Sequence, residues 1–510
     1  MDDYFYQPLL LSVVAVALLQ LLKLALRPAT SPRPPPGPWE LPVIGGMHHL
    51  VNVLPHRALR DLAAVHGPLM MLRLGQTPMV VVSSKETARA VLKTHDTNFA
   101  TRPKLLAGEI VGYEWVDILF APSGDYWRKL RQLCAAEILS SKRVLSFRHI
   151  REDEVMLCVE EIRAAGPSTP VNISVMFHSI TNSIVSRAAF GKKRHNAAEF
   201  LAATKAVVGL ASGFNVPDLF PAWTRVLAGL TGMTRSLRDI HRTVDTILQE
   251  IIDERRAARE AKVRSGVEGE DVDENLVDVL VGLQEKGGFG FTLTNSIIKA
   301  VILDMFAGGT GTSGSAMEWA MSELMRTPAV MKKLQGQIRE AFHGKSQVTE
   351  ADLQASNLQY LKLVIKEALR LHPPAPMLVP RESIEACEVA GYTVPAKARV
   401  VINAWAIGRD PKYWGKHADE FRPERFEDGA VDFTGGSYEF LPFGSGRRMC
   451  PGFNYGLASM ELSLVGLLYH FDWSLPEGVK EVDMEEAPGL GVRRRSPLML
   501  CATPFVAATA

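Results

Sequence analysis

Residues 443–452 constrain the fold of this chain more than any other stretch, and they read Phe-Gly-Ser-Gly-Arg-Arg-Met-Cys-Pro-Gly. The glycines permit tight backbone turns, and a helical pattern of apolar residues begins soon after Cys450. We therefore predict that the sulfur lies near a helix N-terminus, where the helix dipole and the adjacent Arg447 and Arg448 favour a thiolate. Most cysteines are simply small buried apolar residues, but a thiolate held in a tight loop is suited to binding a haem iron.

The composition indicates an ordinary globular protein with a large core. Of the 510 residues, 47% are hydrophobic and 22% are charged, which excludes disordered and collagen-like chains. The five cysteines are an odd number and form no C-x-x-C pair, which argues against a disulfide framework and a structural zinc site. The net charge of +1 gives no global field that would attract nucleic acid, so we expect any charged partner to meet a local patch.

The N-terminal segment is predicted to anchor the chain in a membrane. Residues 4–22 carry no charge and would span about 28 Å as a helix, close to the thickness of the hydrocarbon core. A cleaved signal peptide and a buried amphipathic helix are the alternatives, and the acidic Asp2 and Asp3 disfavour cleavage. Basic residues follow the segment, which favours a cytosolic location for the rest of the chain. We predict an anchor over residues 4–26, a stiff proline-rich hinge over 27–38 and one domain over 39–510.

This domain is predicted to be mainly α with a small β part, an α+β fold. A hairpin is expected from residues 69–74 and 79–83, and further strands between residues 388 and 403. Helical spacing of apolar residues occurs over residues 84–94, 126–160, 236–262, 294–326 and 358–371. Residues 264–274 are rich in Gly, Glu and Asp and are typical of a mobile surface connector.

The spacing within the cysteine segment matches a family pattern. The pattern F-x-x-G-x-R-x-C-x-G is met by Phe443, Gly446, Arg448, Cys450 and Gly452, so the chain resembles the cytochrome P-450 superfamily of haem-thiolate monooxygenases. The resemblance implies a cytochrome P-450 fold with haem b between a central helix and the cysteine loop. It also implies that Cys450 is the axial iron ligand, that Arg448 faces a haem propionate and that Phe443 covers the sulfur. Such a ligand accompanies oxygen activation rather than reversible oxygen carriage.

Two further segments match the same family in order and spacing. Residues 367–370, Glu-Ala-Leu-Arg, resemble its E-x-x-R helix, and residues 423–426 resemble its P-E-R-F segment. Alone, a glutamate and an arginine three residues apart would usually be an exposed ion pair of small effect. The resemblance instead places Glu367, Arg370 and Arg425 in a structural core behind the haem.

Three more residues are implied as propionate contacts. Trp127 and Arg131 lie four residues apart, on one helix face, and resemble the family's W-x-x-x-R helix. A core tryptophan beside a surface arginine is the plainer interpretation of that pair. Arg381 stands where the family often has another propionate-binding residue. Arg128 and Lys129 are expected to contribute to a basic patch that an acidic reductase surface could dock on.

Residues 304–315 resemble the oxygen-binding central helix of the family, written [AG]-G-x-[DE]-T-[TS]. The residues in register are Gly308, Gly309, Thr312 and Ser313. Glycines permit such a helix to open beside the iron, and the resemblance implies that Thr312 delivers protons during oxygen activation. Gly311 replaces the usual acid, so we expect Thr310, Ser313, a water chain or a substrate hydroxyl to compensate.

The missing acid leaves other functions open. One is a haem-thiolate isomerase or dehydratase that works without O2, and another is a non-catalytic haem sensor or carrier. Residues 309–314 also match the dinucleotide fingerprint G-x-G-x-x-G, but no βαβ unit surrounds them, which disfavours an NAD-binding protein. The retained Thr312 favours a monooxygenase that receives electrons from NADPH through a reductase, with cytochrome b5 as a second candidate donor.

The resemblance extends over nearly the whole chain to the large plant microsomal group that oxidises specialised metabolites. It implies a single-pass protein of the endoplasmic reticulum membrane, with O2 and a hydrophobic small molecule as substrates and lipid as a partner. The positions that line the substrate pocket in that group are apolar here: Ile118, Leu119, Phe120, Phe306, Ala307, Met377, Leu378, Leu490 and Val492. These residues favour a terpenoid, with phenolic, indolic or oxime substrates as alternatives, although core packing would select the same residue types. Residues 214–221 are expected either to dip into the bilayer or to pack as a loop.

Overall fold

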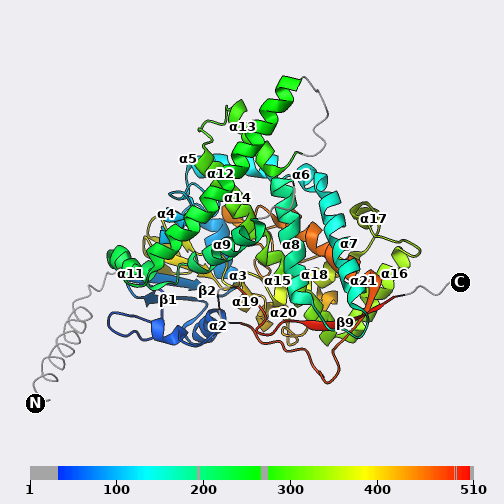
Figure 1. The fold of residues 1–510 in the computed structure, drawn as a ribbon. Coiled ribbons are helices and arrows are strands. Elements are labelled where there is room, and N and C mark those ends of the chain that lie inside the picture. Colours follow the sequence, from blue (N-terminus) through cyan, green and yellow to red (C-terminus); the bar gives the residue numbers. More distant parts are fainter. Residues whose placement is uncertain (1–32, 192–195, 266–273, 488, 490, 506–510) are drawn as a thin grey trace, which may run out of the picture.

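The computed structural model describes residues 33–191, 196–265, 274–487, 489 and 491–505 (Figure 1). The predicted anchor, the first part of the hinge, most of the connector and Leu490 lie outside these ranges. Within them, no helix combines the length and the apolar character that crossing a bilayer requires. The described part of the hinge is neither helix nor strand, and it packs on the body, because the Pro36 carbonyl accepts the Met71 N–H at 2.8 Å.

Helices make up most of the described chain and enclose one large hydrophobic core. The helices at its centre are α7 (Arg148–Ala165), α8 (Ile173–Phe190), α14 (Asn295–Gly309), α15 (Gly311–Arg326), α18 (Gln359–Leu371) and α21 (Phe453–His470). Around them lie α2 (Pro55–His66), α3 (Lys85–Arg89), α4 (Leu106–Ile110), α5 (Asp125–Leu133), α6 (Ser141–Ser146), α9 (Ala197–Leu210), α10 (Val216–Leu219), α11 (Thr224–Leu230), α12 (Met233–Ser265), α13 (Leu276–Lys286), α16 (Pro328–Ala341), α17 (Glu350–Ala355), α19 (Ala404–Ile407) and α20 (Pro411–Trp414). The α8 and α21 helices both pack along α15, so the core is built around the segment predicted to bind oxygen.

Short strands form the small β part. The predicted hairpin is confirmed as β1 (Leu69–Leu74) and β2 (Thr77–Val82), which pair antiparallel. A parallel strand, β7 (Arg399–Ile402), continues this sheet beyond β2, and β4 (Arg381–Glu382) forms its other edge. The remaining strands are β3 (Val171–Asn172), β5 (Cys387–Val389), β6 (Tyr392–Val394), β8 (Phe471–Ser474) and β9 (Met499–Pro504). The mainly helical fold with small sheets agrees with the sequence prediction.

The predicted helix over residues 294–326 is interrupted. It consists of α14 and α15, which meet at Thr310, whose backbone dihedrals are φ −92° and ψ −62°. The Thr310 carbonyl accepts a hydrogen bond from the Thr181 hydroxyl of α8 at 3.0 Å. This outside partner supports the opening that the glycines permit.

The single helical stretch predicted over residues 126–160 is wrong. It consists of α5, a π-helical turn (Cys134–Ile138), α6 and α7. The Ser140 side chain accepts the Arg143 N–H at the start of α6, as a helix N-cap does, and so begins a new helix inside the periodic pattern. Apolar spacing alone does not reveal this interruption, because the neighbouring helices bury faces of similar period.

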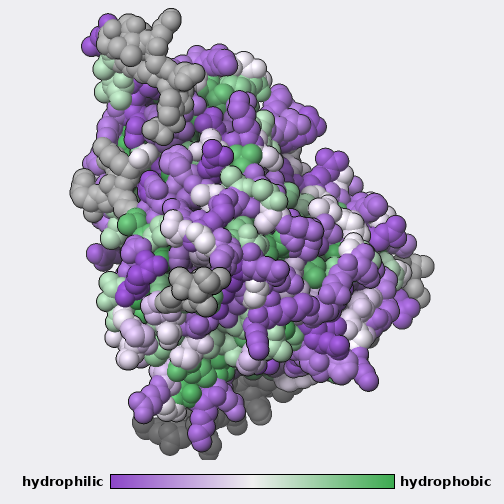
Figure 2. All heavy atoms as spheres, turned by 90° about the vertical axis from the view of Figure 1, so that its right-hand side faces the viewer, coloured by the Kyte–Doolittle hydropathy of each residue, from purple (hydrophilic) through white to green (hydrophobic). Residues whose placement is uncertain are grey.

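The two sides of the molecule differ in surface character. Hydrophilic side chains cover most of the face near α16 and α17 (Figure 2). Exposed apolar side chains occur instead near α11 and the turn between β1 and β2, on the opposite side of the body (Figure 1). The residues concerned include Trp39, Val43, Val216, Trp223, Val226 and Leu230.

Candidate active site

The Cys450 loop ends just before the core helix α21. The Cys450 N–H donates to the Phe443 carbonyl at 2.9 Å, which closes the loop, and the Phe443 ring packs against Phe433 and Phe453. Gly446 has φ +70°, and a Cβ at this residue would lie 2.5 Å from the Leu92 carbonyl oxygen. Glycine is therefore required at this position of the motif for both conformation and space.

The cation that acts on the Cys450 thiol is Arg131, and not Arg447 or Arg448, which the sequence suggested for this role. Arg447 is half exposed and pairs with Asp96, and the Arg448 guanidinium binds backbone carbonyls. Burial raises the pKa of the Cys450 thiol, while the Gly452 N–H and the Arg131 guanidinium act to lower it. The prediction that Arg447 and Arg448 favour the thiolate is wrong; Arg131, which donates to the Met449 carbonyl, takes that place.

Trp127, Arg131, Arg381 and Arg448 are brought together, as the family resemblance implied. The Arg448 guanidinium lies 3.8 Å from the centre of the Trp127 ring, and Arg131 lies 5.8 Å from it. Arg381 donates to the Ser445 carbonyl at 2.8 Å and pairs with Asp96 at 3.1 Å. Residues far apart in the sequence thus form one basic cluster next to the cysteine loop.

Sequence reasoning missed a fourth arginine in this cluster. Arg102 is buried and donates to the carbonyls of Leu119, Val379 and Pro380. Burial and the charge of Arg448 lower its pKa well below the usual value. The only hint in the sequence is an arginine within the otherwise apolar and small stretch Phe99-Ala-Thr-Arg-Pro, since such a residue must find buried partners.

The basic cluster fits a dianionic cofactor. Burial and the neighbouring Arg381 and Arg131 lower the pKa of Arg448 to about 9, so positive charges crowd a region of low polarity. Asp96 pairs with Arg381, and Asp117 is the carboxylate that offsets Arg448 and Arg102. Counting Arg447, which also pairs with Asp96, two carboxylates therefore face five guanidiniums. Haem carries two propionates, which would supply the missing negative charge.

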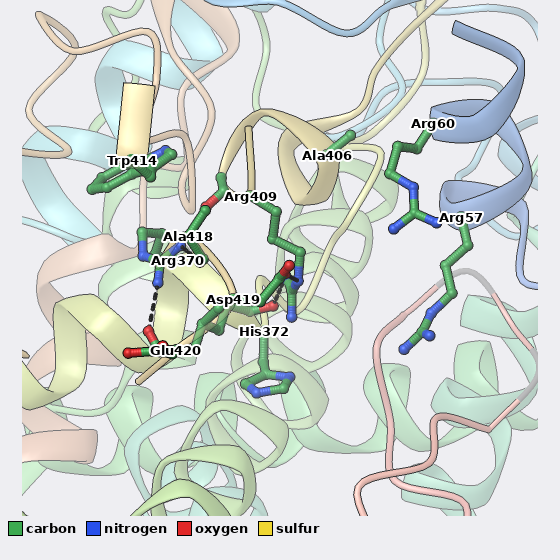
Figure 3. Close-up of polar contacts among 12 residues, drawn as sticks. Arg57, Arg60, Arg370, His372, Ala406, Arg409, Trp414, Ala418, Asp419 and Glu420 are labelled. Carbon is green, nitrogen blue, oxygen red and sulfur yellow. Dashed lines mark hydrogen bonds and ion pairs between the residues drawn. The ribbon is translucent and has the colours of Figure 1, made fainter. Parts of the chain in front are cut away.

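Glu367, Arg370 and Arg425 form a fully connected ionic core. Arg370 makes two hydrogen bonds of 2.7 Å to the Glu367 carboxylate, and Arg425 donates to the same carboxylate at 2.9 Å. Figure 3 shows Arg370 between the Trp414 ring and the backbone of Ala418 and Glu420. The Glu367 and Arg370 side chains are completely buried, so these residues are placed to stabilise the fold and not to contact substrate.

The segment formed by α14 and α15, which we call the distal helix, has one open face. The Thr312 hydroxyl donates to the Gly308 carbonyl at 2.6 Å, and both residues are exposed although their helix runs through the core. Among the described residues, nothing lies within 4 Å of where a Cβ would stand at Gly308 or Gly311. Packing therefore does not impose the loss of the acid at Gly311.

Thr310 and Ser313 do not share this face, so the expectation that they compensate for the missing acid is wrong. Both are buried, and the Thr310 hydroxyl donates to the Phe306 carbonyl of its own helix. Ser313 faces α21, where its oxygen would lie 3.4 Å from a Cβ placed at Gly456. Of the four candidates to replace the acid that is missing at Gly311, a water chain and a substrate hydroxyl remain.

Several predicted pocket residues belong to the core instead. Phe306 is 2% exposed and stacks on Phe190 at 5.1 Å. Ile118, Met377 and Val492 are likewise buried within hydrophobic clusters, Val492 beside two tryptophans. For these four residues core packing accounts for the apolar side chain without a role in the pocket. The candidates that keep some exposure are Leu119, Ala307 and Leu378, whereas Phe120 is buried.

Comparisons with known proteins agree with this arrangement. A family model described as Cytochrome P450 matches residues 34–502. Premnaspirodiene oxygenase of Hyoscyamus muticus is 51% identical over 474 residues, which cover 92% of this chain and 93% of that protein. The 5-epiaristolochene 1,3-dihydroxylase of Nicotiana tabacum is 47% identical over 474 residues, with the same shares of both chains. A solved zebra fish cytochrome P450 has a TM-score of 0.75 at 22% identity, covers 89% of this chain and 100% of its own, and shares the fold.

These matches decide between the functions that the sequence left open. Residues 309–314 lie at the junction of α14 and α15 and not in a strand-to-helix turn, so the dinucleotide fingerprint is coincidental. The isomerase, dehydratase and sensor interpretations are set aside with it. Because the family model spans most of its length, the chain belongs to the cytochrome P450 family and is a haem-thiolate monooxygenase that incorporates oxygen from O2.

Proposed function

We propose that this monooxygenase hydroxylates a terpenoid or a related hydrophobic plant metabolite. The observation that carries the proposal is the similarity of about half of all residues, over nearly the full chain, to plant oxygenases named for premnaspirodiene and 5-epiaristolochene. The partly exposed candidates Leu119, Ala307 and Leu378 are all apolar, which suits a hydrocarbon scaffold.

We further propose the residues that hold the cofactor. Cys450 would bind the haem iron through its sulfur, and Trp127, Arg102, Arg131, Arg381 and Arg448 would bind or border the propionates. Haem, when bound, supplies the activation of O2. Gly446 allows the loop to turn, and the Phe443 carbonyl and ring fix its closed shape.

Thr312 is proposed to hold a proton at its hydroxyl on the open face of the distal helix. Its hydrogen bond to the Gly308 carbonyl leaves the oxygen lone pairs free to accept from water or substrate. Gly311, which lies beside it, has no side chain to supply a second proton, so we assign that task to ordered water.

The chain is proposed to sit in the endoplasmic reticulum membrane through residues 4–26, with residues 27–38 as a hinge. The exposed apolar residues near α11 support contact of the body with the bilayer, with Trp223 58% and Leu230 80% exposed. Residues 214–221 are mostly packed, since Leu219 is 3% exposed and lies in the cluster with β1 and β2. We therefore assign the lipid contact to Val216 and to the residues that follow this segment, and not to its buried part.

An NADPH-dependent reductase, with cytochrome b5 as a second donor, is proposed to dock near the cysteine loop. Arg447 is about half exposed, and Arg128 and Lys129 of α5 are exposed to a similar or smaller degree. Arg131 joins α5 to the cysteine loop through the Met449 carbonyl. These residues form a basic patch close to the proposed iron ligand, although Asp125 pairs with both α5 cations and weakens it.

Oxygen-isotope labelling tests the proposed function. Microsomes that contain the full chain and a plant reductase are supplied with NADPH and with separate terpenoid and phenolic panels that include premnaspirodiene. We expect a terpenoid product that carries one labelled atom from heavy-isotope O2 and that forms only with NADPH. Conversion of phenolic compounds alone would overturn the terpenoid proposal while leaving the family assignment intact.

The Gly311→Asp variant tests the proton route. Since the space beside Gly311 is open, an aspartate fits there and supplies the acid next to Thr312. We expect the yield of hydroxylated product per NADPH to rise at least about twofold, because a positioned acid accelerates proton transfer. The Gly311→Asn variant has the same size without the acid and should leave the yield unchanged. Equal yields from the two variants would show that proton supply does not limit this enzyme.

A further inference from the structure

Residues 117–121 connect α4 to α5 without forming a helix or a strand, and they carry the pocket candidates Leu119 and Phe120. Buried backbone groups in such a loop need hydrogen-bond partners from elsewhere. Here their N–H groups bind side-chain carboxyl groups. Asp304 of α14 accepts from Ile118 at 2.7 Å and from Leu119 at 3.2 Å. Asp117 accepts from Phe120 at 2.5 Å and from Ala121 at 3.0 Å.

The carbonyls of the same loop point to cationic and polar donors. The Ile118 carbonyl accepts from the Trp127 indole at 3.0 Å and from Arg448 at 3.1 Å. Arg102 donates to the Leu119 carbonyl at 3.0 Å, and Arg448 also donates to the Ala121 carbonyl. The loop is thus held between two carboxyl groups and the arginines proposed to bind the propionates.

Asp304 joins this loop to the open face of the distal helix. It lies four residues before Gly308, which in turn lies four residues before Thr312, so the three residues follow one helix face. Asp304 itself is partly exposed on this face, whereas Asp117 is 3% exposed. Any movement of the loop relative to α14 must therefore change the hydrogen bonds that Asp304 accepts from Ile118 and Leu119.

The electrostatics indicate what each carboxyl group contributes. Burial raises the pKa of Asp117 to about 6, opposed by the N–H groups it accepts and by Arg448 and Arg102. Burial and the charge of Asp117 raise the pKa of Asp304 well above its usual value, opposed by the N–H groups of Ile118 and Leu119. Tyr126 and Cys134 also face these groups, and their own pKa values are raised, so they add no charge near neutral pH. Asp304 needs only an acceptor oxygen to hold the loop, while Asp117 carries the charge that faces the arginines.

We propose that Asp304 and Asp117 are positioning residues that fix residues 117–121 against the distal helix, and that this contact sets the size of ligand that can approach the haem. The inference goes beyond the hydroxylation proposed above. It rests on the proposed haem site only in taking residues 117–121 to border the pocket that leads to the haem. It assigns to Asp304 an effect on specificity that acts through the loop it holds.

Amide hydrogen exchange of the purified full chain tests the contact directly. In the Asp304→Leu variant we expect exchange at Ile118 and Leu119 to accelerate about tenfold, since both N–H groups lose their acceptor. The Asp304→Asn variant keeps an acceptor oxygen, so its exchange should stay within about twofold of the parent protein. Should leucine prevent folding, Asp304→Ser takes its place, because its side chain is too short to reach the loop. Unchanged exchange in the variant that lacks the acceptor would overturn the proposal.

Two azole probes test the consequence for ligand size. Imidazole and 1-phenylimidazole are titrated into the holoprotein and followed by the haem absorption. We expect Asp304→Leu to change the ratio of the two dissociation constants at least about fivefold and Asp304→Asn to leave it unchanged. A ratio that is the same in all variants, or that changes equally in the asparagine variant, would overturn the proposed role.

A stability control separates positioning from general damage. Asp278 caps α13 through Asn275 and lies outside residues 117–121 and α14, so Asp278→Leu should cost stability without changing the azole ratio. A ratio altered equally by this control would assign the effect to destabilisation and overturn the proposal. The carbon monoxide difference spectrum of each variant reports on the haem assignment separately, and the exchange measurement needs no iron.

Discussion

Replacing Cys450 by serine is expected to abolish the thiolate-type carbon monoxide difference spectrum and to reduce hydroxylation to background. Cys450 has the only thiol in the loop of residues 443–452, and a serine hydroxyl is a much weaker electron donor to iron. The loop itself should persist, because the N–H of residue 450 still donates to the Phe443 carbonyl. The measurement is the difference spectrum of the reduced, carbon monoxide-bound protein, together with the haem content.

A matched control is available at Cys387. This thiol is also only partly exposed, and its sulfur accepts a hydrogen bond from the Asn98 amide, which a serine oxygen can accept as well. The Cys387→Ser variant should keep the spectrum and the activity of the parent protein. A thiolate-type spectrum that survives in Cys450→Ser would contradict the assignment of the ligand.

Replacing Glu367 by glutamine is expected to prevent accumulation of folded holoprotein. The Glu367 carboxylate receives three side-chain hydrogen bonds from Arg370 and Arg425 and one from the Arg422 N–H at 2.8 Å. Glutamine keeps the volume but leaves the buried Arg370 charge without its counterion, which typically costs about 3–5 kcal/mol. Since domains are stable by only about 5–15 kcal/mol in total, most of the margin is lost. Thermal unfolding and the haem content of the purified protein measure the effect.

Glu424 provides the control for this experiment. It lies next to Arg425 in the same segment, but its side chain is 43% exposed and pairs with Lys333 at 2.8 Å. The Glu424→Gln variant should change stability by less than about 1 kcal/mol, as exposed ion pairs do. If Glu367→Gln unfolds at the same temperature as this control, the ionic core does not have the role assigned to it.

The motifs that the sequence revealed are those in which the chemistry depends on local spacing. Cys450 and its glycines, the Glu367–Arg370 pair and the Trp127–Arg131 pair each lie within a few residues of one another, so their patterns can be recognised along the chain. The β1–β2 hairpin was predictable for the same reason, because two apolar runs flank a Gly-Gln-Thr-Pro turn.

The residues that sequence reasoning missed depend on contacts between distant segments. Arg102 binds the carbonyls of Val379 and Pro380, and Asp304 binds amides that lie more than 180 residues away. The spacing of apolar residues along the chain does not indicate such pairs. The ring contacts of Phe306 were not predictable for the same reason, since its partners on α8 and α9 become visible only when the helices are packed.

The crowded arginines near Cys450 link the amount of folded protein to the supply of haem. Without a dianionic ligand, these arginines are crowded in a buried region: burial lowers the pKa of Arg102, Arg131, Arg381 and Arg448, and the charge of neighbouring arginines lowers it further for Arg102, Arg381 and Arg448. A ligand that binds only the folded state stabilises it in proportion to the logarithm of its concentration. Cells in which haem synthesis lags behind translation would therefore lose this chain to proteolysis before any shortage of substrate limits its activity.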